Sequence, residues 1–69
     1  MIEVFKTNVQ HKIITEDISA ELRYRLPGSR ISFDLDDCDK VLRIESNYVD
    51  PELVVNTLKK RGFNCEILE

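Results

Sequence analysis

The sequence predicts a single α+β domain, residues 1–69, in which strands and helices follow one another in the order βαββαβ. The chain has 69 residues, which suits one domain and leaves no length for a second hydrophobic core. Short segments alternate apolar and polar side chains, as strands with one buried face do. Two other segments repeat apolar residues every three or four positions, which is typical of amphipathic helices.

The first helix is expected between an extended segment at residues 2–9 and a turn at residues 27–29. Thr15 is the expected N-cap, because Glu16 and Asp17 would then place negative charge in the first helical turn, where the helix dipole favours it. Pro27 and Gly28 are expected to end the helix after about ten residues. Its buried stripe recurs every four positions and comprises Ile14, Ile18, Leu22 and Leu26.

Two strands are expected to form a hairpin around an acidic turn. Residues 30–36 alternate cleanly between apolar and polar side chains, and residues 40–46 resume an extended pattern with Leu42 and Ile44 facing the core. The turn between them contains Asp36, Asp37, Cys38 and Asp39. Like charges at the end of a strand also discourage a second molecule from pairing with the sheet edge.

The second helix has clear signals at both ends. Asp50 is the expected N-cap, Pro51 suits the first helical position, and Glu52 complements the dipole. Gly62 is expected to take the left-handed conformation that follows many helices. The stripe that this helix buries comprises Leu53, Val54, Thr57 and Leu58. Residues 63–67 then alternate as a last strand, with Phe63, Cys65 and Ile67 facing inward.

Because each helix has one apolar stripe, both helices must cover the same face of the sheet. Right-handed crossovers then give a four-stranded antiparallel sheet with the strand order 4-1-3-2. This is the ferredoxin-like, or split-βαβ, sandwich, whose other sheet face is open. The topology brings His11, the acidic residues 34–39 and the turn at residues 62–64 to one end of the sheet. A functional site is expected at that end.

The charge balance excludes several classes of function. Thirteen acidic and ten basic residues give a formal charge of −3, which provides no basic surface for nucleic acid. The open sheet face also lacks aromatic platforms for RNA bases, since it is expected to carry Val4, Lys6, Val41, Arg43, Glu45 and Glu66. No apolar run approaches the roughly 20 residues of a membrane span and no leader peptide is recognisable, so a cytoplasmic location is expected.

Two segments and the order of elements carry a family resemblance. They are FKTNVQHKII at residues 5–14 and the late spacing Val54-x-x-x-Leu58-x-x-x-Gly62-Phe63. Together with the βαββαβ order, they make nearly the whole chain resemble the heavy-metal-associated domains of the copper chaperone type. In that family the first loop reads MxCxxC, and its two thiolates bind a soft metal ion. An aromatic residue or a lysine in the turn before the last strand lies beside them.

This chain departs from the family pattern at both metal ligands. The resemblance places Val9 at the methionine, His11 at the first cysteine, Ile14 at the second and Phe63 at the turn aromatic. A neutral imidazole and an aliphatic group do not supply the soft donors that a monovalent metal ion prefers. We therefore expect a degenerate site, with weak metal binding through His11 or none, and no other cofactor.

The two cysteines lie outside this motif. Cys65 is expected in the core and Cys38 in the exposed acidic turn. A disulfide between them is not expected. The first strand of the chain lies between the third and the fourth, which are next to Cys38 and Cys65, and it keeps these two strands about 9–10 Å apart. Cys38 and Phe63 are candidates for the surface beside His11, and a divalent site formed by His11, Cys38 and a carboxylate stays an open alternative. The residues form no recognisable catalytic arrangement, so no enzyme is expected.

These observations predict a non-catalytic heavy-metal-associated-like domain that acts through protein contacts, with a protein partner or as a weak homodimer. The alternative is a regulatory module that senses a small molecule, since such modules share this topology and often pair through their sheets. Ligand binding by an amino acid would favour the second hypothesis.

Overall fold

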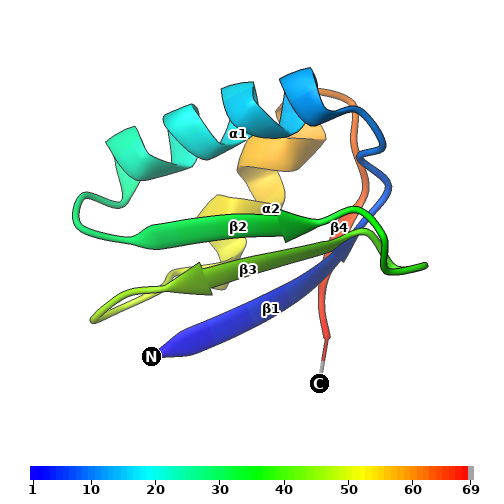
Figure 1. Cartoon of the computed structure of the whole chain (residues 1–69). Helices are drawn as coiled ribbons and strands as arrows, with labels where there is room; N and C mark the ends of the chain where they lie inside the picture. Colours follow the sequence, from blue (N-terminus) through cyan, green and yellow to red (C-terminus); the bar gives the residue numbers. More distant parts are fainter. Residues whose placement is uncertain (69) are drawn as a thin grey trace.

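The computed structural model describes residues 1–68 and has the predicted βαββαβ order. The elements are β1 (Ile2–Thr7), α1 (Lys12–Arg25), β2 (Arg30–Asp34), β3 (Val41–Glu45), α2 (Pro51–Lys60) and β4 (Cys65–Ile67). The strands form one antiparallel sheet in the order β2-β3-β1-β4, and both helices lie on one face of it (Figure 1). The predicted ferredoxin-like α+β fold is therefore confirmed.

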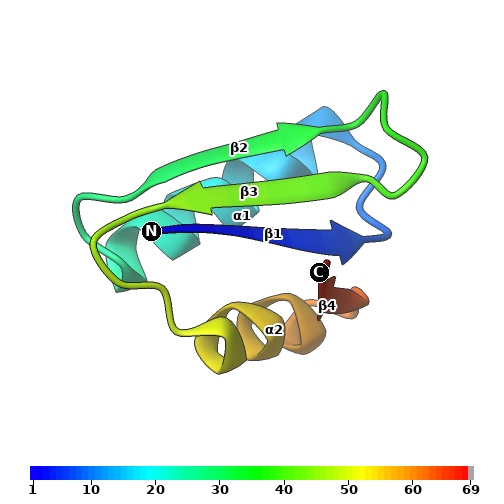
Figure 2. The same ribbon diagram turned by 90° about the horizontal axis from the view of Figure 1, so that it is seen from below.

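The core lies between this face of the sheet and the helices. Its fully or nearly fully buried side chains are Phe5, Val9, Ile18, Leu22, Leu42, Ile44, Val49, Val54, Leu58 and Cys65. On β3 the burial alternates as expected, with Leu42 and Ile44 inward and Arg43 and Glu45 exposed. Seen from below, the sheet lies in front of α1, and no helix of residues 1–68 covers its other face (Figure 2).

Helix α1 begins earlier than the sequence predicts. Thr15 is not the N-cap but lies within the helix, where its hydroxyl donates to the carbonyl of Lys12 at 2.6 Å. The N-cap is His11, which has an extended backbone (φ −109°, ψ 130°). The first turn therefore contains no acidic residue among those described, and α1 has 14 residues. The earlier start places the half-buried Ile14 on the helix, where it packs against the core.

Strands β1, β2 and β3 are all shorter than predicted. At the ends of β1 and β2, polar side chains bond to the backbone and turn the chain. Strand β1 stops at Thr7, whose hydroxyl accepts a hydrogen bond from the Val9 backbone at 3.3 Å. Strand β2 stops at Asp34, whose carboxylate accepts one from the Asp36 backbone at 3.2 Å. Strand β3 begins only after Lys40, the one non-glycine residue of residues 1–68 with a positive φ (47°).

Helix α2 has the predicted caps. The Asp50 carboxylate accepts a hydrogen bond from the Glu52 backbone at 3.1 Å. At the other end Gly62 has φ 87°, and the backbone N–H groups of Gly62 and Phe63 donate to carbonyls of the last helical turn at 2.9 and 3.0 Å. Because these bonds hold Phe63 at the helix end, the last strand is only Cys65–Ile67 rather than residues 63–67.

An ion-pair network joins the helical layer. The Glu21 carboxylate on α1 lies 2.7 Å from Arg61 Nη2, just after α2, and 3.0 Å from Arg25 Nε one turn along α1. The network links two elements 40 positions apart in the sequence. Within residues 1–68, neither helix combines the length and the apolar character that crossing a bilayer requires.

Candidate functional site

The three loops expected at one end of the sheet lie there together. The Asn64 backbone donates to Asn8 Oδ1 at 2.8 Å, which ties the turn after α2 to the loop after β1. The Thr7 backbone donates to the carbonyl of Asp39 at 3.0 Å and its hydroxyl to that of Lys40 at 2.6 Å, which ties β1 to the hairpin. These loops, which we call the rim, comprise residues 8–11, 35–40 and 62–64 (Figure 1).

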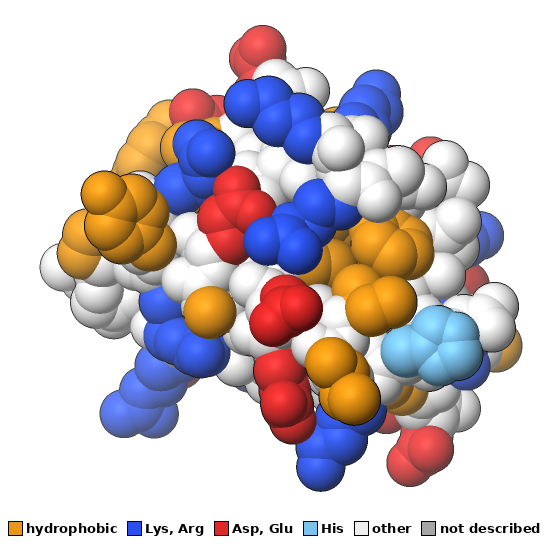
Figure 3. Space-filling model, turned by 90° about the horizontal axis from the view of Figure 1, so that it is seen from above, with side chains coloured by type: hydrophobic (Ala, Val, Ile, Leu, Met, Phe, Trp, Pro, Cys, Tyr) orange, Lys and Arg blue, Asp and Glu red, His pale blue; other side chains and the backbone are white. Residues whose placement is uncertain are grey.

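His11 lies on the helical side of the rim. Its side chain is exposed, and it makes no capping hydrogen bond to any of residues 1–68. Figure 3 shows the histidine at one side of the helical face, beside hydrophobic side chains. The imidazole is therefore accessible as a single metal ligand or proton donor.

The other positions of the family motif offer no metal donor. Val9 is fully buried, and Ile14 and Phe63 are half-buried and pack against the core. Ile13, two positions after His11, is 75 % exposed. Within this motif, then, one imidazole stands where two thiolates would be needed, and the side chains do not fit a linear soft-metal site.

The acidic turn contains a compact group of potential ligands. Asp37, Cys38 and Asp39 place their ligand atoms within 4.8 Å of one another, and among residues 1–68 no other group of three or more does so. Its carboxylates already have partners. Asp37 Oδ1 accepts a hydrogen bond from the Asp39 backbone at 2.8 Å, and Asp39 Oδ1 lies 3.7 Å from Lys6 Nζ. These contacts account for the group as the closure of a tight turn; His11 is not part of it.

The two thiols differ as the sequence predicts. Cys38 is exposed and Cys65 is buried, and neither is in a disulfide within the described chain. Burial raises the pKa of the Cys65 thiol to about 11, and the nearby Glu66 charge adds to this effect while Lys59 opposes it. Cys65 is therefore a protonated core residue, without the thiolate that nucleophilic or metal chemistry requires.

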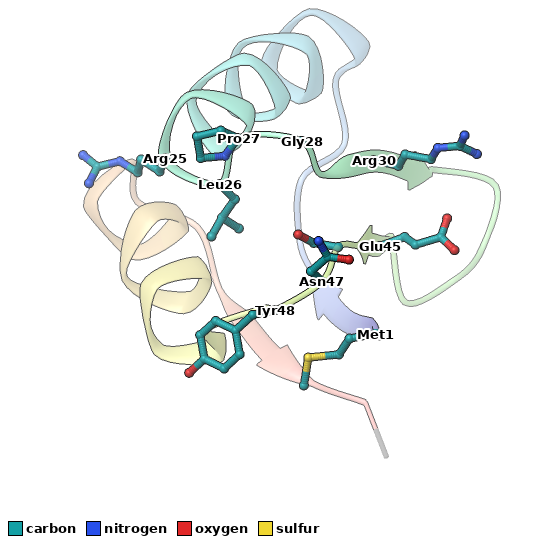
Figure 4. A pocket seen from close by; sticks show the side chains of 10 residues that line it. Met1, Arg25, Leu26, Pro27, Gly28, Arg30, Glu45, Asn47 and Tyr48 are labelled. Carbon is teal, nitrogen blue, oxygen red and sulfur yellow. The ribbon is translucent and has the colours of Figure 1, made fainter.

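A shallow groove of about 700 Å³ lies at the opposite end of the sheet. Its walls come from the end of α1, the start of β2, the loop before α2 and the N-terminus. Arg30 and Glu45 are direct neighbours in the β2–β3 register. In Figure 4 they lie side by side, whereas Arg25 points the other way, so the charged groups do not converge on the groove. This pair could have been found in the sequence by pairing residues of the two strands in order, outward from the hairpin turn, from Asp34 with Val41 to Arg30 with Glu45.

A second shallow groove of about 430 Å³ runs between α1 and β2. The α1 side chains that line it are Lys12, Thr15, Glu16, Ser19 and Arg23. Residues 31–36 form the opposite wall. The sequence did not indicate this groove, because it depends on how α1 lies along the outer strand of the sheet.

The open sheet face carries the side chains that were expected there. Val4 and Val41 are half-buried, and the exposed charged residues are Lys6, Arg43, Glu45 and Glu66. In the register of the sheet, Lys6 is opposite Glu66 and Val4 is opposite Arg43. The face is therefore mixed in character, with apolar and charged groups alternating across the strands.

Comparison with known proteins adds no relative to this description. No protein-family model matches the sequence, and no curated protein does.

Proposed function

We propose that this chain is a non-catalytic protein-interaction domain of the heavy-metal-associated type, with a metal-binding loop that has lost its thiolates. The observation that carries the proposal is the donor set of the loop. His11 is exposed at the first ligand position, while Ile14 packs against the core at the second. A lone imidazole holds a divalent ion weakly and lacks the softness that a monovalent copper ion requires.

The buried polar side chains are accounted for by the fold. Every buried side-chain nitrogen and oxygen atom of residues 1–68 has a hydrogen-bond partner, as structural polar groups in protein interiors do. A cytoplasmic location fits the same proposal, because a reducing compartment keeps Cys38 and Cys65 as thiols.

Copper(I) competition titration tests the metal part of the proposal. The background is Cys38→Ser, so that the exposed thiol of the hairpin does not contribute. We expect weak binding that falls further in the His11→Ala variant. Tight, stoichiometric binding that is insensitive to His11→Ala would contradict the proposal.

A gain-of-function variant tests the resemblance itself. In the same background, His11→Cys/Ile14→Cys restores both thiolates at the family's positions, and we expect copper(I) affinity to rise by about a thousandfold or more. The matched control is His11→Cys/Ile13→Cys, which has the same number of thiols at the wrong spacing. Equal affinities for the two double variants would show that the loop lacks the family's geometry.

The small-molecule-sensing alternative has a separate readout. A thermal-shift screen against amino acids and metal salts detects a ligand that binds the folded state. The diverging charges around the groove in Figure 4 favour no shift with amino acids. A reproducible, concentration-dependent increase in Tm with one amino acid would replace the interaction role with the sensing role.

A further inference from the structure

Strand β2 is an outer strand of the sheet that residues 1–68 form. It pairs with β3 over five consecutive residues, Arg30–Asp34, without a bulge, a proline or a glycine. An outer strand leaves half of its backbone N–H and C=O groups without a partner in the sheet, and a regular one can align with another strand. The edge is therefore geometrically able to accept a further strand.

The side chains of β2 are self-complementary about Ser32. Arg30 and Asp34 carry opposite charges at equal distances on either side of it, on the exposed side of the strand. Ile31 and Phe33 flank it on the half-buried side. If a second copy aligned antiparallel with Ser32 opposite Ser32, each Arg30 would face an Asp34, and each Ile31 a Phe33. Opposite charges and apolar side chains in directly opposed positions both stabilise a sheet.

The groove between α1 and β2 has the same polarity. Helix α1 runs antiparallel to β2, so Glu16 lies toward the Asp34 end of the strand and Arg23 toward the Arg30 end (Figure 1). Lys12 is the one cation that lines the acidic end of the groove among the described residues. The antiparallel alignment that joins Arg30 to Asp34 therefore also brings Arg23 of one copy toward Glu16 of the other.

We propose that two copies of this chain associate through β2, antiparallel about a two-fold axis at Ser32. The proposal rests on the interaction role proposed above and names its partner. The two four-stranded sheets then continue as one sheet of eight strands, with both helical layers on the same side. The charged and apolar side chains of β2 complement a second, antiparallel β2, so a second copy of this chain is favoured over an unrelated partner.

The charges of β2 favour the antiparallel alignment over a parallel one. With Ser32 on the axis, Asp36 is opposite Gly28 of the second copy, and the residues that follow lie beyond the paired segment. A parallel alignment would instead place Arg30 beside Arg30 and Asp34 beside Asp34, and like charges directly opposite each other are destabilising. The acidic turn thus lies outside the paired segment in the antiparallel alignment and does not obstruct it.

Sedimentation velocity from about 5 to about 500 µM in reducing buffer tests the proposal, because a five-residue edge gives a weak dimer that forms in the upper part of that range. We expect the sedimentation coefficient to rise with concentration. Asp34→Arg and Arg30→Asp each place like charges at the interface and should weaken the dimer at least about tenfold. The double variant Arg30→Asp/Asp34→Arg inverts both charges and should restore it.

Glu66→Arg is the matched control, since it reverses an exposed charge on β4, the other outer strand. It should leave the dimer unchanged. Circular dichroism confirms that each variant is folded, which matters because Asp34 also caps the Asp36 backbone. Single reversals without effect, or a folded double variant that stays monomeric, would overturn the proposal. A monomer at every concentration would overturn it too, without affecting the copper titrations that test the metal loop.

Disulfide trapping tests the position of the axis. In antiparallel pairs, directly opposed Cα atoms are about 4.5–5.5 Å apart, which a disulfide can span. In a Cys38→Ser background, mild oxidation should therefore convert Ser32→Cys to a covalent dimer. Asn56→Cys, at a position that is also exposed but lies on α2, serves as the control. Equal trapping of the two variants would exclude an axis at Ser32.

Discussion

Cys38 and Cys65 have the same chemistry but opposite surroundings. Cys38 is exposed in the hairpin, whereas Cys65 is 6 % exposed and its pKa is raised to about 11. We expect one thiol per folded chain to react with a disulfide reagent near neutral pH and two in denaturant, as absorbance of the released thiol reports. The Cys38→Ser variant should lose the fast reaction; rapid modification of Cys65 in the folded variant would contradict its burial.

The ion pairs of Glu21 make the stability of the folded chain depend on pH. Its hydrogen bond to Arg61 lowers its pKa below the usual 4.5, and the bond to Arg25 contributes in the same direction. Because the pKa is lower in the folded state, the network stabilises the fold fully above about pH 4.5, and this stabilisation is lost as the pH falls through the lowered value. Solvent exposure of the pair keeps the effect modest.

Glu21→Gln should therefore lower the free energy of unfolding at pH 7 by about 0.5–1 kcal/mol and reduce its fall below pH 4.5. Urea unfolding at several pH values measures this change. Asp17→Asn, which removes an exposed carboxylate from the same helix, should have a smaller effect. Parallel pH curves for the wild type and Glu21→Gln would exclude the network as the source.

At the scale of single elements, the two helices begin differently. The Asp50 carboxylate caps α2, whereas the His11 side chain at the start of α1 makes no such bond within residues 1–68. Asp50→Ala should therefore cost about 1 kcal/mol of stability, while His11→Ala should cost much less. Thermal unfolding of the two variants compares the caps directly, and equal losses would argue against this difference.

The start of α1 shows why local signals can fail. Thr15 followed by Glu16 and Asp17 has the composition of a helix N-terminus, and local propensity alone favours it. The structure instead begins α1 at Lys12, so that Ile14 lies on the same helix as Ile18 and contacts the core. Thr15 uses its hydroxyl within the helix. The earlier start thus places Ile14, part of the predicted stripe, on the helix itself, where packing against the core supports it.

The strand boundaries have a related explanation. Alternation predicted the buried positions of β3 correctly, as Leu42 and Ile44 show, but Ile67, predicted to face inward, is 39 % exposed on β4. The alternation also continued past the true ends of the strands. The ends of β1 and β2 are determined by hydrogen bonds that the side chains of Thr7 and Asp34 accept from backbone N–H groups two positions later. Such bonds compete with sheet pairing, and the hydropathy pattern contains no information about them.

At the scale of the whole molecule, the βαββαβ order was sufficient to predict the sheet and the meeting of three loops at the rim. It was not sufficient to predict the groove between α1 and β2, because the groove depends on how α1 packs along β2. The symmetry of charge in β2 is visible in the sequence around Ser32, yet it has meaning only because β2 is an outer strand. Topology had to be known before that pattern could be interpreted.

Because the domain is small, the fold is sensitive to truncation of a single buried side chain. A chain of this length has a stability of only about 3–5 kcal/mol, and truncating a buried leucine costs about 2–5 kcal/mol. We expect Leu22→Ala, at a fully buried position, to unfold most of the protein at 25 °C by far-UV circular dichroism. Tyr24→Ala, on the same helix at an 85 % exposed position, should change stability by less than about 0.5 kcal/mol. A folded, cooperative Leu22→Ala variant would show a larger stability margin.

Thr7 connects two segments of the rim through hydrogen bonds. Through its backbone N–H and its hydroxyl it donates to Asp39 and Lys40, and the same hydroxyl accepts from Val9. Breaking the contacts to the hairpin therefore also loosens the segment that leads into α1. Amide hydrogen exchange in these two segments should follow one shared opening event rather than two separate ones. We therefore expect the loop that carries His11 and the turn that carries Cys38, far apart in the sequence, to open together.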